Sequence, residues 1–210
     1  MRTNNPHQGT GAWFNERTGK LTASRMRSAM KRLKNGEDAA ERRNLKIEIL
    51  AERLTGDIVP KFSTAAMQWG IDNEPFAKET YEQVTGRVIQ DCGFFNHPNI
   101  EFCGASPDGL VEEGLIEVKC PTTGTHLEWV LQGEVPAEYK PQMTLQAAVT
   151  GRPWVDFVSF DPRVPAPHQL FVRRFYPTPS ELEHIEDEAL RFLEEVDVMF
   201  ETLTTREMVE

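Results

Sequence analysis

The chain has 210 residues, of which 39% are hydrophobic, enough for a single domain with its own core. It contains no apolar run of membrane-spanning length, and its first residues lack the apolar region of a secretion signal. Three cysteines without metal-site spacing are typical of a reducing compartment. We therefore expect a cytoplasmic protein with no membrane partner.

The net charge of −10 argues against a nucleic-acid partner until its distribution is considered. Residues 1–61 carry 13 basic and 7 acidic side chains, whereas residues 179–210 carry 2 basic and 11 acidic ones. Six basic residues and no acidic one lie between Lys20 and Lys34. A local basic surface can bind a phosphate backbone whatever the overall charge. The alternative is an ordinary solvated helix face.

The first part of the chain is predicted to be helical. Residues 1–12 are polar and glycine-rich, and we expect them to be flexible. A short helix or turn follows at 13–17. A basic helix then starts at 21–24, with Thr22 as its N-cap, and ends near Gly36. Two further helices are expected at 38–54 and 65–84, joined by a loop over 56–64 and stopped by glycines. Four side chains of the second of these suit its core side: Trp69, Phe76, Ala77 and Tyr81.

From residue 86 the pattern changes to short strands at 87–95, 100–105, 110–111 and 115–120, which we expect to form an antiparallel meander. A short helix at 127–131 and a stronger one at 139–149 follow, then strands at 154–160 and 170–175. Residues 178–181 form a capping box that opens a long acidic helix ending near residue 203. This order predicts an α/β (α+β) fold, with a central mixed β-sheet flanked by helices.

The most informative stretch runs from the Ser106-Pro-Asp108-Gly turn into the strand at 115–120. Because strand side chains alternate, Leu115, Glu117 and Lys119 share one face. Two carboxylates that converge there could hold a hard cation such as Mg²⁺. A lysine beside them could position or deprotonate an attacking water, which suits metal-assisted phosphodiester hydrolysis. The alternative is a structural Glu–Lys pair beside an ordinary turn, because the pattern is short.

Several motifs in the right order make the pattern specific. Gly70-x₃-Glu74 precedes the Asp108 turn, and a helical Gln142 follows Glu117-x-Lys119. The order resembles the nuclease core of the PD-(D/E)xK superfamily with its restriction-endonuclease-like fold. More narrowly it resembles the lambda exonuclease family, the YqaJ-type viral recombinase domain. An N-terminal Trp13-x₃-Arg17, a Thr-Ala-Ser run at 22–24 and an Asp-Pro-Arg run at 161–163 also match that family.

The resemblance implies a Mg²⁺-dependent exonuclease, with Mn²⁺ as a substitute, that degrades one strand of linear duplex DNA from its 5′ end. It further implies a ring-shaped homotrimer, a single-strand annealing protein as partner, and a phage or prophage origin in a bacterial host. The whole chain, 1–210, would be one nuclease domain. Its parts would be the flexible N-terminus 1–12, a basic DNA-end-binding part 13–60, a catalytic core 61–178 and an acidic helix 179–210.

The resemblance also assigns roles to residues. The metal would be held by Asp108, Glu117 and the Val118 carbonyl, and Lys119 would position or deprotonate the water. Glu74 would support the metal site, and Gln142 and Tyr139 would orient Lys119 and the scissile phosphate. The family's 5′-phosphate pocket maps onto Arg17, Ser24 and Ser106, and its apolar end-splitting wedge onto Met67, which could instead be a core residue.

One position departs from the superfamily pattern. Many members have a tyrosine four residues after the helical glutamine, whereas this chain has Gln146. Two alternatives stay open: an endonuclease of the same superfamily, and a non-catalytic DNA-binding or assembly protein with a retained nuclease fold. The complete set of Glu74, Asp108, Glu117 and Lys119 argues against the second.

Overall fold

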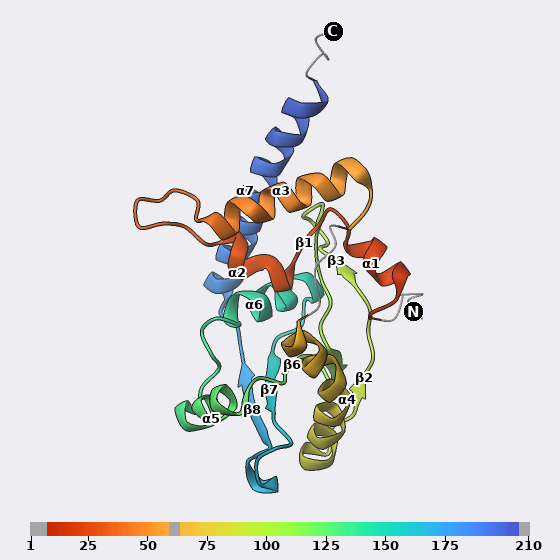
Figure 1. The fold of residues 1–210 in the computed structure, drawn as a ribbon, viewed down its shortest axis with the longest axis vertical. Coiled ribbons are helices and arrows are strands. Elements are labelled where there is room, and N and C mark those ends of the chain that lie inside the picture. Colours follow the sequence, from red (N-terminus) through yellow and green to blue (C-terminus); the bar gives the residue numbers. More distant parts are fainter. Residues whose placement is uncertain (1–7, 59–63, 206–210) are drawn as a thin grey trace.

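The computed structural model describes residues 8–58 and 64–205 (Figure 1). The parts of the predicted N-terminus, loop and C-terminal segment that fall on 1–7, 59–63 and 206–210 lie outside it. The first half of the chain contains α1 (Gly11–Arg17), β1 (Leu21–Thr22), the 3-10 turn η1 (Ala23–Arg25), α2 (Met26–Ala29), α3 (Ala40–Thr55), α4 (Ala65–Thr85), β2 (Ile89–Gln90), β3 (Phe95–Asn96) and β4 (Cys103–Ala105). The second half contains β5 (Gly109–Val111), β6 (Gly114–Lys119), α5 (Thr123–Gln132), α6 (Lys140–Thr150), β7 (Val155–Phe160), η2 (Ala166–His168), β8 (Leu170–Phe175) and α7 (Pro179–Thr204).

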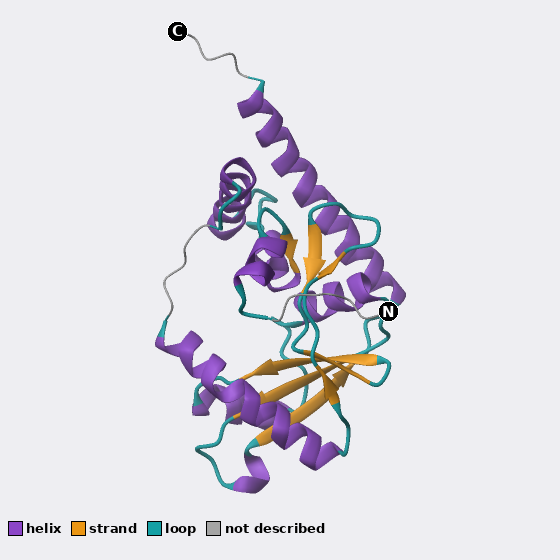
Figure 2. Ribbon diagram, turned by 90° about the vertical axis from the view of Figure 1, so that its right-hand side faces the viewer, coloured by secondary structure: helices purple, strands orange, loops and turns teal. Residues whose placement is uncertain are grey.

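The strands form two mixed sheets. The larger has the order β2-β5-β6-β7-β8, in which only β6 and β7 run parallel. The smaller has the order β1-β4-β3, with β1 parallel to β4. Figure 2 shows the two sheets one above the other, with the long α7 rising beside the smaller one. The expected mixed α/β architecture with flanking helices is therefore confirmed.

Strand β6 lies in the middle of the larger sheet and is buried on both faces. On one face Leu115 packs with Trp129 and Met143, from α5 and α6. On the other, Ile116 and Val118 pack with helix α4. The predicted alternation of β6 is thus confirmed, and Glu117 and Lys119 lie on the α6 side. A buried strand of this kind holds its side chains in one orientation, which suits a site that needs fixed carboxylates.

Helix α6 joins the two halves of the molecule. Its residues Met143 and Ala147 pack on the larger sheet. Leu145 and Val149, on its other side, belong to a second core built from α2, α3, α7 and the smaller sheet. Because one helix contributes to both cores, the smaller sheet and its helices hold a fixed position relative to β6. Among the described residues, no helix is both long and apolar enough to cross a membrane.

Three predictions of detail were wrong. The basic helix expected from residue 22 to Gly36 is only η1 followed by the single turn α2, and Thr22 caps η1 without a side-chain hydrogen bond. The expected meander is divided between the two sheets, because β2 pairs with β5 whereas β3 pairs with β4. Phe76, expected on the core side of α4, is 58% exposed, while Ala77 and Tyr81 are buried as predicted.

Candidate active site

Asp108 stands at the entrance to β5 and is tied to the neighbouring strand. Its Oδ2 accepts a hydrogen bond from the Val118 backbone N–H at 2.7 Å, and its own backbone N–H donates to the Ile116 carbonyl at 3.1 Å. Among the described residues, its Oδ1 accepts no hydrogen bond. The Pro-Asp-Gly turn thus fixes this carboxylate beside β6 and leaves one oxygen for a ligand.

Glu117 is the most buried member of the site, with 1% of its surface exposed. Lys119 Nζ and Gln142 Nε2 both donate to its Oε1, the second at 2.5 Å. Gln146 Nε2 donates to its Oε2 at 2.5 Å. A buried carboxylate requires such partners, because its desolvation is costly when it is left unpaired. Helix α6 therefore holds Glu117 from the side opposite to α4.

Gln146 occupies the position at which the sequence departs from the superfamily pattern. It is fully buried, and it makes the hydrogen bond to Glu117 that fixes the second oxygen of that carboxylate. Sequence reasoning identified Gln146 as a departure and missed this contact. The spacing of four residues from Gln142 was the available signal, since residues i and i+4 share one face of a helix.

We call the three carboxylates of Glu74, Asp108 and Glu117 the acidic cluster, in which Asp108 repels each of the two glutamates. Burial, and next the charge of Asp108, raise the pKa of Glu74. Burial also raises the pKa of Glu117, and Asp108 adds to the effect while Lys119 opposes it. Like charges held together out of water favour a bound cation. The cluster therefore has the electrostatics of a cation site.

Lys119 stays charged in this environment. Burial alone would lower its pKa, but the charges of Glu117 and Asp108 outweigh burial and raise the pKa above that of an ordinary lysine. Its Nζ also lies 5.2 Å from the centre of the Tyr139 ring. A protonated lysine donates hydrogen bonds and does not accept protons, so it can orient a water or a phosphate oxygen here. Of the two roles expected for Lys119, this environment favours positioning.

Lys78 is a second cation at the site, and sequence reasoning missed it. It lies one helical turn after Glu74 on α4, and the two side chains form an ion pair at 2.7 Å. Glu74, Asp108 and Asp91 together raise the pKa of Lys78 against the effect of burial. The i,i+4 spacing could have revealed it. Lys78 offsets part of the acidic charge on the α4 side, as Lys119 does on the α6 side.

The donors present fit Mg²⁺. In residues 8–58 and 64–205, no group of three or more His, Cys, Asp or Glu side chains is placed so that it could hold a metal ion by itself. Mg²⁺ does not require one, because it usually binds through one or two carboxylates and keeps several waters. Asp108 and Glu117 supply hard oxygen donors, and the mutual repulsion of the cluster favours a divalent cation. The chemistry of these oxygen donors is compatible with Mg²⁺.

Two cavities of about 500 and 520 Å³ lie beside Glu74 of the acidic cluster. Both are lined by Gln8, Ile71 and Glu74, so they are neighbours, and we call the two together the groove. The first extends to Trp13 and Asp108, and the second to Lys119 and Tyr139. Met67 lines the second cavity and is 51% exposed. The alternative of a core role for Met67 is thus excluded, and the residue lies at the rim of the groove.

Arg17, Ser24 and Ser106 come together although they are far apart in sequence. Arg17 Nη1 donates to Ser106 Oγ at 3.1 Å, and Arg17 Nη2 donates to Ser24 Oγ at 3.4 Å. Trp13 Nε1 also donates to Ser106 Oγ, at 2.9 Å, and the Arg17 guanidinium lies 4.2 Å from the Trp13 ring centre. We call these four residues the Arg17 pocket. Trp13 adds a contact that the sequence did not predict.

The Arg17 pocket has the electrostatics of an anion site. Both side-chain hydrogen bonds of Arg17 go to hydroxyl groups and not to a carboxylate. Burial, and next the charge of Arg25, lower its pKa to about 10, so the guanidinium stays charged at neutral pH. A guanidinium and two hydroxyls can bind the oxygens of a terminal phosphate. Ser106 is two residues from Asp108, so the pocket adjoins the acidic cluster.

The basic segment between Lys20 and Lys34 is not a free cationic stripe. Arg25 pairs with Glu48 and Glu52, Arg32 pairs with Glu188, and Arg27 pairs with Glu138. These acidic partners come from α3, α7 and the segment before α6, where sequence reasoning could not pair them. Ion pairs therefore neutralise much of the positive charge of this segment, while the Arg17 guanidinium contacts hydroxyl groups instead.

The Asp-Pro-Arg run at 161–163 lies beside the groove. The Arg163 guanidinium donates to both oxygens of the buried Asp161, at 2.7 and 3.0 Å, and to the Pro121 carbonyl at 3.0 Å. It also lies 4.3 Å from the Trp69 ring centre. The run thus connects the end of β7, the segment after β6 and helix α4. Its observed contacts support the groove walls and do not reach the acidic cluster.

Comparisons with known proteins agree with this geometry. Residues 12–153 match the model of a family described as the YqaJ-like viral recombinase domain. An alkaline exonuclease from Laribacter hongkongensis, LHK-Exo, is 42% identical, with 93% of this chain and 96% of that chain covered and a TM-score of 0.86. The crystal structure of LHK-Exo in complex with dAMP gives 43% identity, 92% and 96% coverage, and a TM-score of 0.86.

A phage-related exonuclease from Haemophilus somnus has the same fold at 15% identity, with a TM-score of 0.70 over 88% of this chain and 96% of that chain. A comparison with curated proteins found no match.

Proposed function

The chain belongs to the YqaJ-like viral recombinase family, and from this premise we propose that it is a Mg²⁺-dependent exonuclease acting 5′ to 3′ on linear double-stranded DNA. Its product would be duplex with 3′ single-stranded overhangs, the substrate for phage-type recombination by strand annealing. The alkaline exonuclease LHK-Exo, which is 43% identical over 92% of this chain, supports the nuclease activity.

One observation carries the proposed polarity: the acidic cluster and the Arg17 pocket share a single short segment of chain. Ser106 accepts hydrogen bonds from Trp13 and Arg17. Asp108, two residues later, belongs to the acidic cluster, where its charge raises the pKa of Glu74. A terminal phosphate has more charge and more free oxygens than an internal diester, so the pocket favours a chain end. A strand whose 5′-phosphate lies at Ser106 would have its first diester beside Asp108.

The chemistry is divided among groups of fixed orientation. Asp108, Glu117 and the Val118 carbonyl would hold Mg²⁺ with support from Glu74, and the chemistry supplied there would be polarisation of the scissile phosphate and activation of water. Lys119, whose pKa the charges of Glu117 and Asp108 raise against burial, would donate a hydrogen bond that orients the water or a phosphate oxygen. Gln142 holds the same Glu117 oxygen as Lys119, and Tyr139 flanks the lysine. These two residues would keep Lys119 and the phosphate aligned.

The remaining features concern the handling of DNA. Met67, at the exposed rim of the groove, would separate the end base pair before the strand enters. Processive action would come from a homotrimeric ring around the duplex, and a single-strand annealing protein would receive the overhang. Mn²⁺ would replace Mg²⁺, because it accepts the same oxygen donors. The chain carries no base-reading motif that we recognise, so we expect little sequence specificity.

The test compares a 5′-phosphorylated linear duplex with a covalently closed circle, each with and without Mg²⁺. The proposal predicts that the linear duplex is degraded only with the metal and that the circle stays intact. Nicking of the circle would instead identify an endonuclease of the same superfamily. The absence of cleavage of both substrates with Mg²⁺ and with Mn²⁺ would favour a non-catalytic binding protein.

A further inference from the structure

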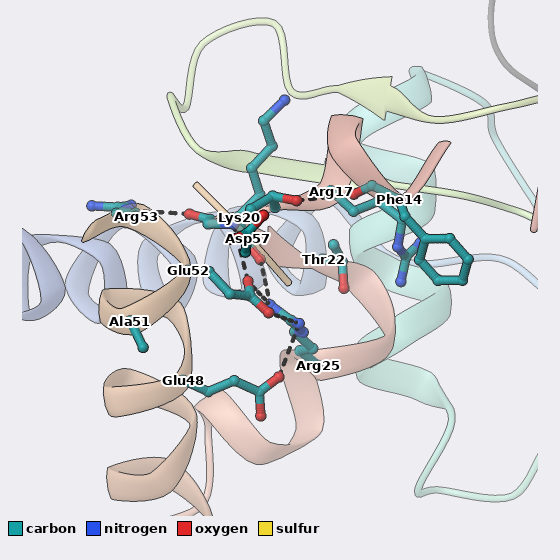
Figure 3. Close-up of polar contacts among 12 residues, drawn as sticks. Phe14, Arg17, Lys20, Thr22, Arg25, Glu48, Ala51, Glu52, Arg53 and Asp57 are labelled. Carbon is teal, nitrogen blue, oxygen red and sulfur yellow. Dashed lines mark hydrogen bonds and ion pairs between the residues drawn. The ribbon is translucent and has the colours of Figure 1, made fainter. Parts of the chain in front are cut away.

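The loop between α1 and β1 is held by a buried ionic network, and this network lies beside the Arg17 pocket (Figure 3). Glu52, on the last turn of α3, is 1% exposed. Its Oε2 accepts the Gly19 backbone N–H at 2.9 Å and Arg25 Nη1 at 3.0 Å. Its Oε1 accepts Arg25 Nη2 at 2.8 Å, and Glu48 also contacts that nitrogen at 2.9 Å. Both oxygens of the Glu52 carboxylate therefore accept hydrogen bonds from groups within the protein.

The network forms hydrogen bonds to both the backbone N–H and the backbone carbonyl of Gly19. While Glu52 accepts its N–H, Arg53 Nε donates to the Gly19 carbonyl at 3.0 Å. The next carbonyl, that of Lys20, accepts Arg25 Nη1 at 3.1 Å. Two consecutive residues of α3 therefore fix the middle of the loop from both sides. In Figure 3 the Arg25 guanidinium lies between Glu48 and Glu52.

Gly19 itself cannot be replaced without strain. Its φ is +69°, in the left-handed region that favours glycine, and a Cβ built there would lie 2.8 Å from Arg53 Cγ. Any larger residue must therefore move the loop away from α3 or displace Arg53. The first change alters the path of the chain immediately after Arg17, and the second disturbs the Arg53 hydrogen bond that holds Gly19.

The three polar side chains of the Arg17 pocket that would bind phosphate are positioned in two different ways. Strand β1 pairs with β4, with Leu21 opposite Cys103 and Thr22 opposite Gly104, so Ser24 and Ser106 follow strands of one sheet. Arg17 ends α1, on the far side of the loop, and belongs to neither strand. Its guanidinium reaches the two hydroxyls because the loop at 18–20 and the Trp13–Ser106 hydrogen bond together direct α1 toward them.

We propose that Gly19 and Glu52 are positioning residues for the 5′-phosphate pocket, because they fix the loop that brings Arg17 to Ser24 and Ser106. This inference rests on the proposed function and deepens it: preference for a 5′-phosphorylated end depends on α3, a helix that does not contact the acidic cluster. Neither residue contacts the phosphate. Their loss should therefore weaken end recognition and leave phosphodiester chemistry unchanged.

The principal test is Gly19→Ala, with Gly86→Ala as its matched control. Gly86 has a φ of +70°, but an added Cβ would meet no atom within 4 Å, so the control carries the same backbone strain far from the loop. The full-length variants are compared on duplexes that end in 5′-phosphate or 5′-hydroxyl. We expect Gly19→Ala to lower the preference for 5′-phosphate over 5′-hydroxyl ends by about tenfold, which is the effect of losing one charge-assisted hydrogen bond. The change should appear as a higher KM for phosphorylated ends. The kcat of Gly19→Ala on hydroxyl ends, and the preference of Gly86→Ala, should not change.

Glu52→Gln separates positioning from simple electrostatics. The amide nitrogen would face an N–H donor of Arg25 or Gly19, so at least one hydrogen bond that holds the loop is lost although the side chain keeps its shape. If Glu52 acted only by its charge, removing that charge near Arg17 would strengthen phosphate binding. A preference that falls supports positioning, and a preference that stays constant or rises in Glu52→Gln overturns it.

A binding measurement keeps this inference separate from the proposed function. In EDTA, fluorescence anisotropy compares the affinity of each protein for the two kinds of duplex end without any cleavage. Failure of the wild-type protein to cleave would overturn the exonuclease proposal. The ratio of affinities for 5′-phosphate and 5′-hydroxyl ends would still test whether the loop positions Arg17. An affinity ratio in Gly19→Ala equal to that of the wild-type protein would overturn the positioning role. A reduced ratio beside an unchanged Gly86→Ala supports it.

Discussion

The acidic cluster and the Arg17 pocket are neighbours built on opposite principles. The cluster gathers three carboxylates, and burial with mutual repulsion raises the pKa of Glu74 and of Glu117. The pocket instead places one guanidinium among hydroxyl groups, and burial, and next the charge of Arg25, lower the pKa of Arg17. The cluster therefore carries an excess of negative charge, whereas the pocket presents a single buried positive charge. This difference fits the proposed function, in which one region would bind a metal and the other a phosphate.

The largest effect should come from Lys119→Ala. The substitution removes the charged donor at the centre of the cluster, and we expect the cleavage rate to fall by about 10²–10³-fold or more. Affinity for a duplex end in EDTA should stay near that of the wild-type protein, because the Arg17 pocket is untouched. Rate assays and anisotropy measure the two properties separately. Full cleavage by the variant would remove Lys119 from the reaction.

Asp108→Asn should abolish cleavage and at the same time stabilise the metal-free protein. The asparagine oxygen can still accept the Val118 N–H, while the charge that raises the pKa of Glu74 and Glu117 is lost. A carboxyl whose pKa is raised on folding destabilises the folded state at pH values above that pKa. The free energy of unfolding should therefore rise by about 0.5–2 kcal/mol at neutral pH.

The higher free energy of unfolding of Asp108→Asn should disappear as the pH falls and the carboxylates of the acidic cluster become protonated. Thermal unfolding in EDTA at a series of pH values measures the difference in stability between the variant and the wild-type protein. Added Mg²⁺ is the control, because it should raise the melting temperature of the wild-type protein only. A less stable variant at neutral pH would contradict the repulsion argument.

Arg17→Ala tests the other region. We expect it to reduce the preference for 5′-phosphate over 5′-hydroxyl ends by roughly 10- to 100-fold, the effect of losing a charged hydrogen-bond donor to a phosphate. Arg17→Lys should be intermediate, because an ammonium lacks the forked geometry of a guanidinium. Steady-state rates on both ends provide the measurement. An unchanged preference in both variants would mean that the pocket does not bind the terminal phosphate.

Gln146→Leu should have the smallest effect and should depend on pH. The Gln146 hydrogen bond lowers the pKa of Glu117 against the upward effect of burial, so its loss raises that pKa further. Because the carboxylate must be ionised to bind the metal, the acidic limb of the pH–rate profile should move to higher pH. At acidic pH the rate should fall by about tenfold, with little change at alkaline pH. A profile that keeps its shape would contradict this role.

The two regions also differ in how far the sequence predicts them. Asp108, Glu117 and Lys119 lie within twelve residues, and the alternation of one strand with one turn is enough to place them together. The Arg17 pocket joins α1, η1 and the end of β4, so only the resemblance could indicate it. The basic helix was predicted from Thr22 as N-cap and a stop at Gly36, but its length is only η1 and one turn of α2. Its charges could not be placed from the sequence, because Arg25 and Arg32 pair with Glu52 and Glu188 from distant helices.

The most direct measurement uses a duplex with a 5′-phosphate on one strand and a 5′-hydroxyl on the other, and a different 3′ fluorophore on each. In Mg²⁺, we predict that the phosphorylated strand shortens steadily from its 5′ end and keeps its label while the other strand stays whole. Early loss of the 3′ label, internal cutting, or equal degradation of both strands would contradict the claim that the Arg17 pocket directs the acidic cluster.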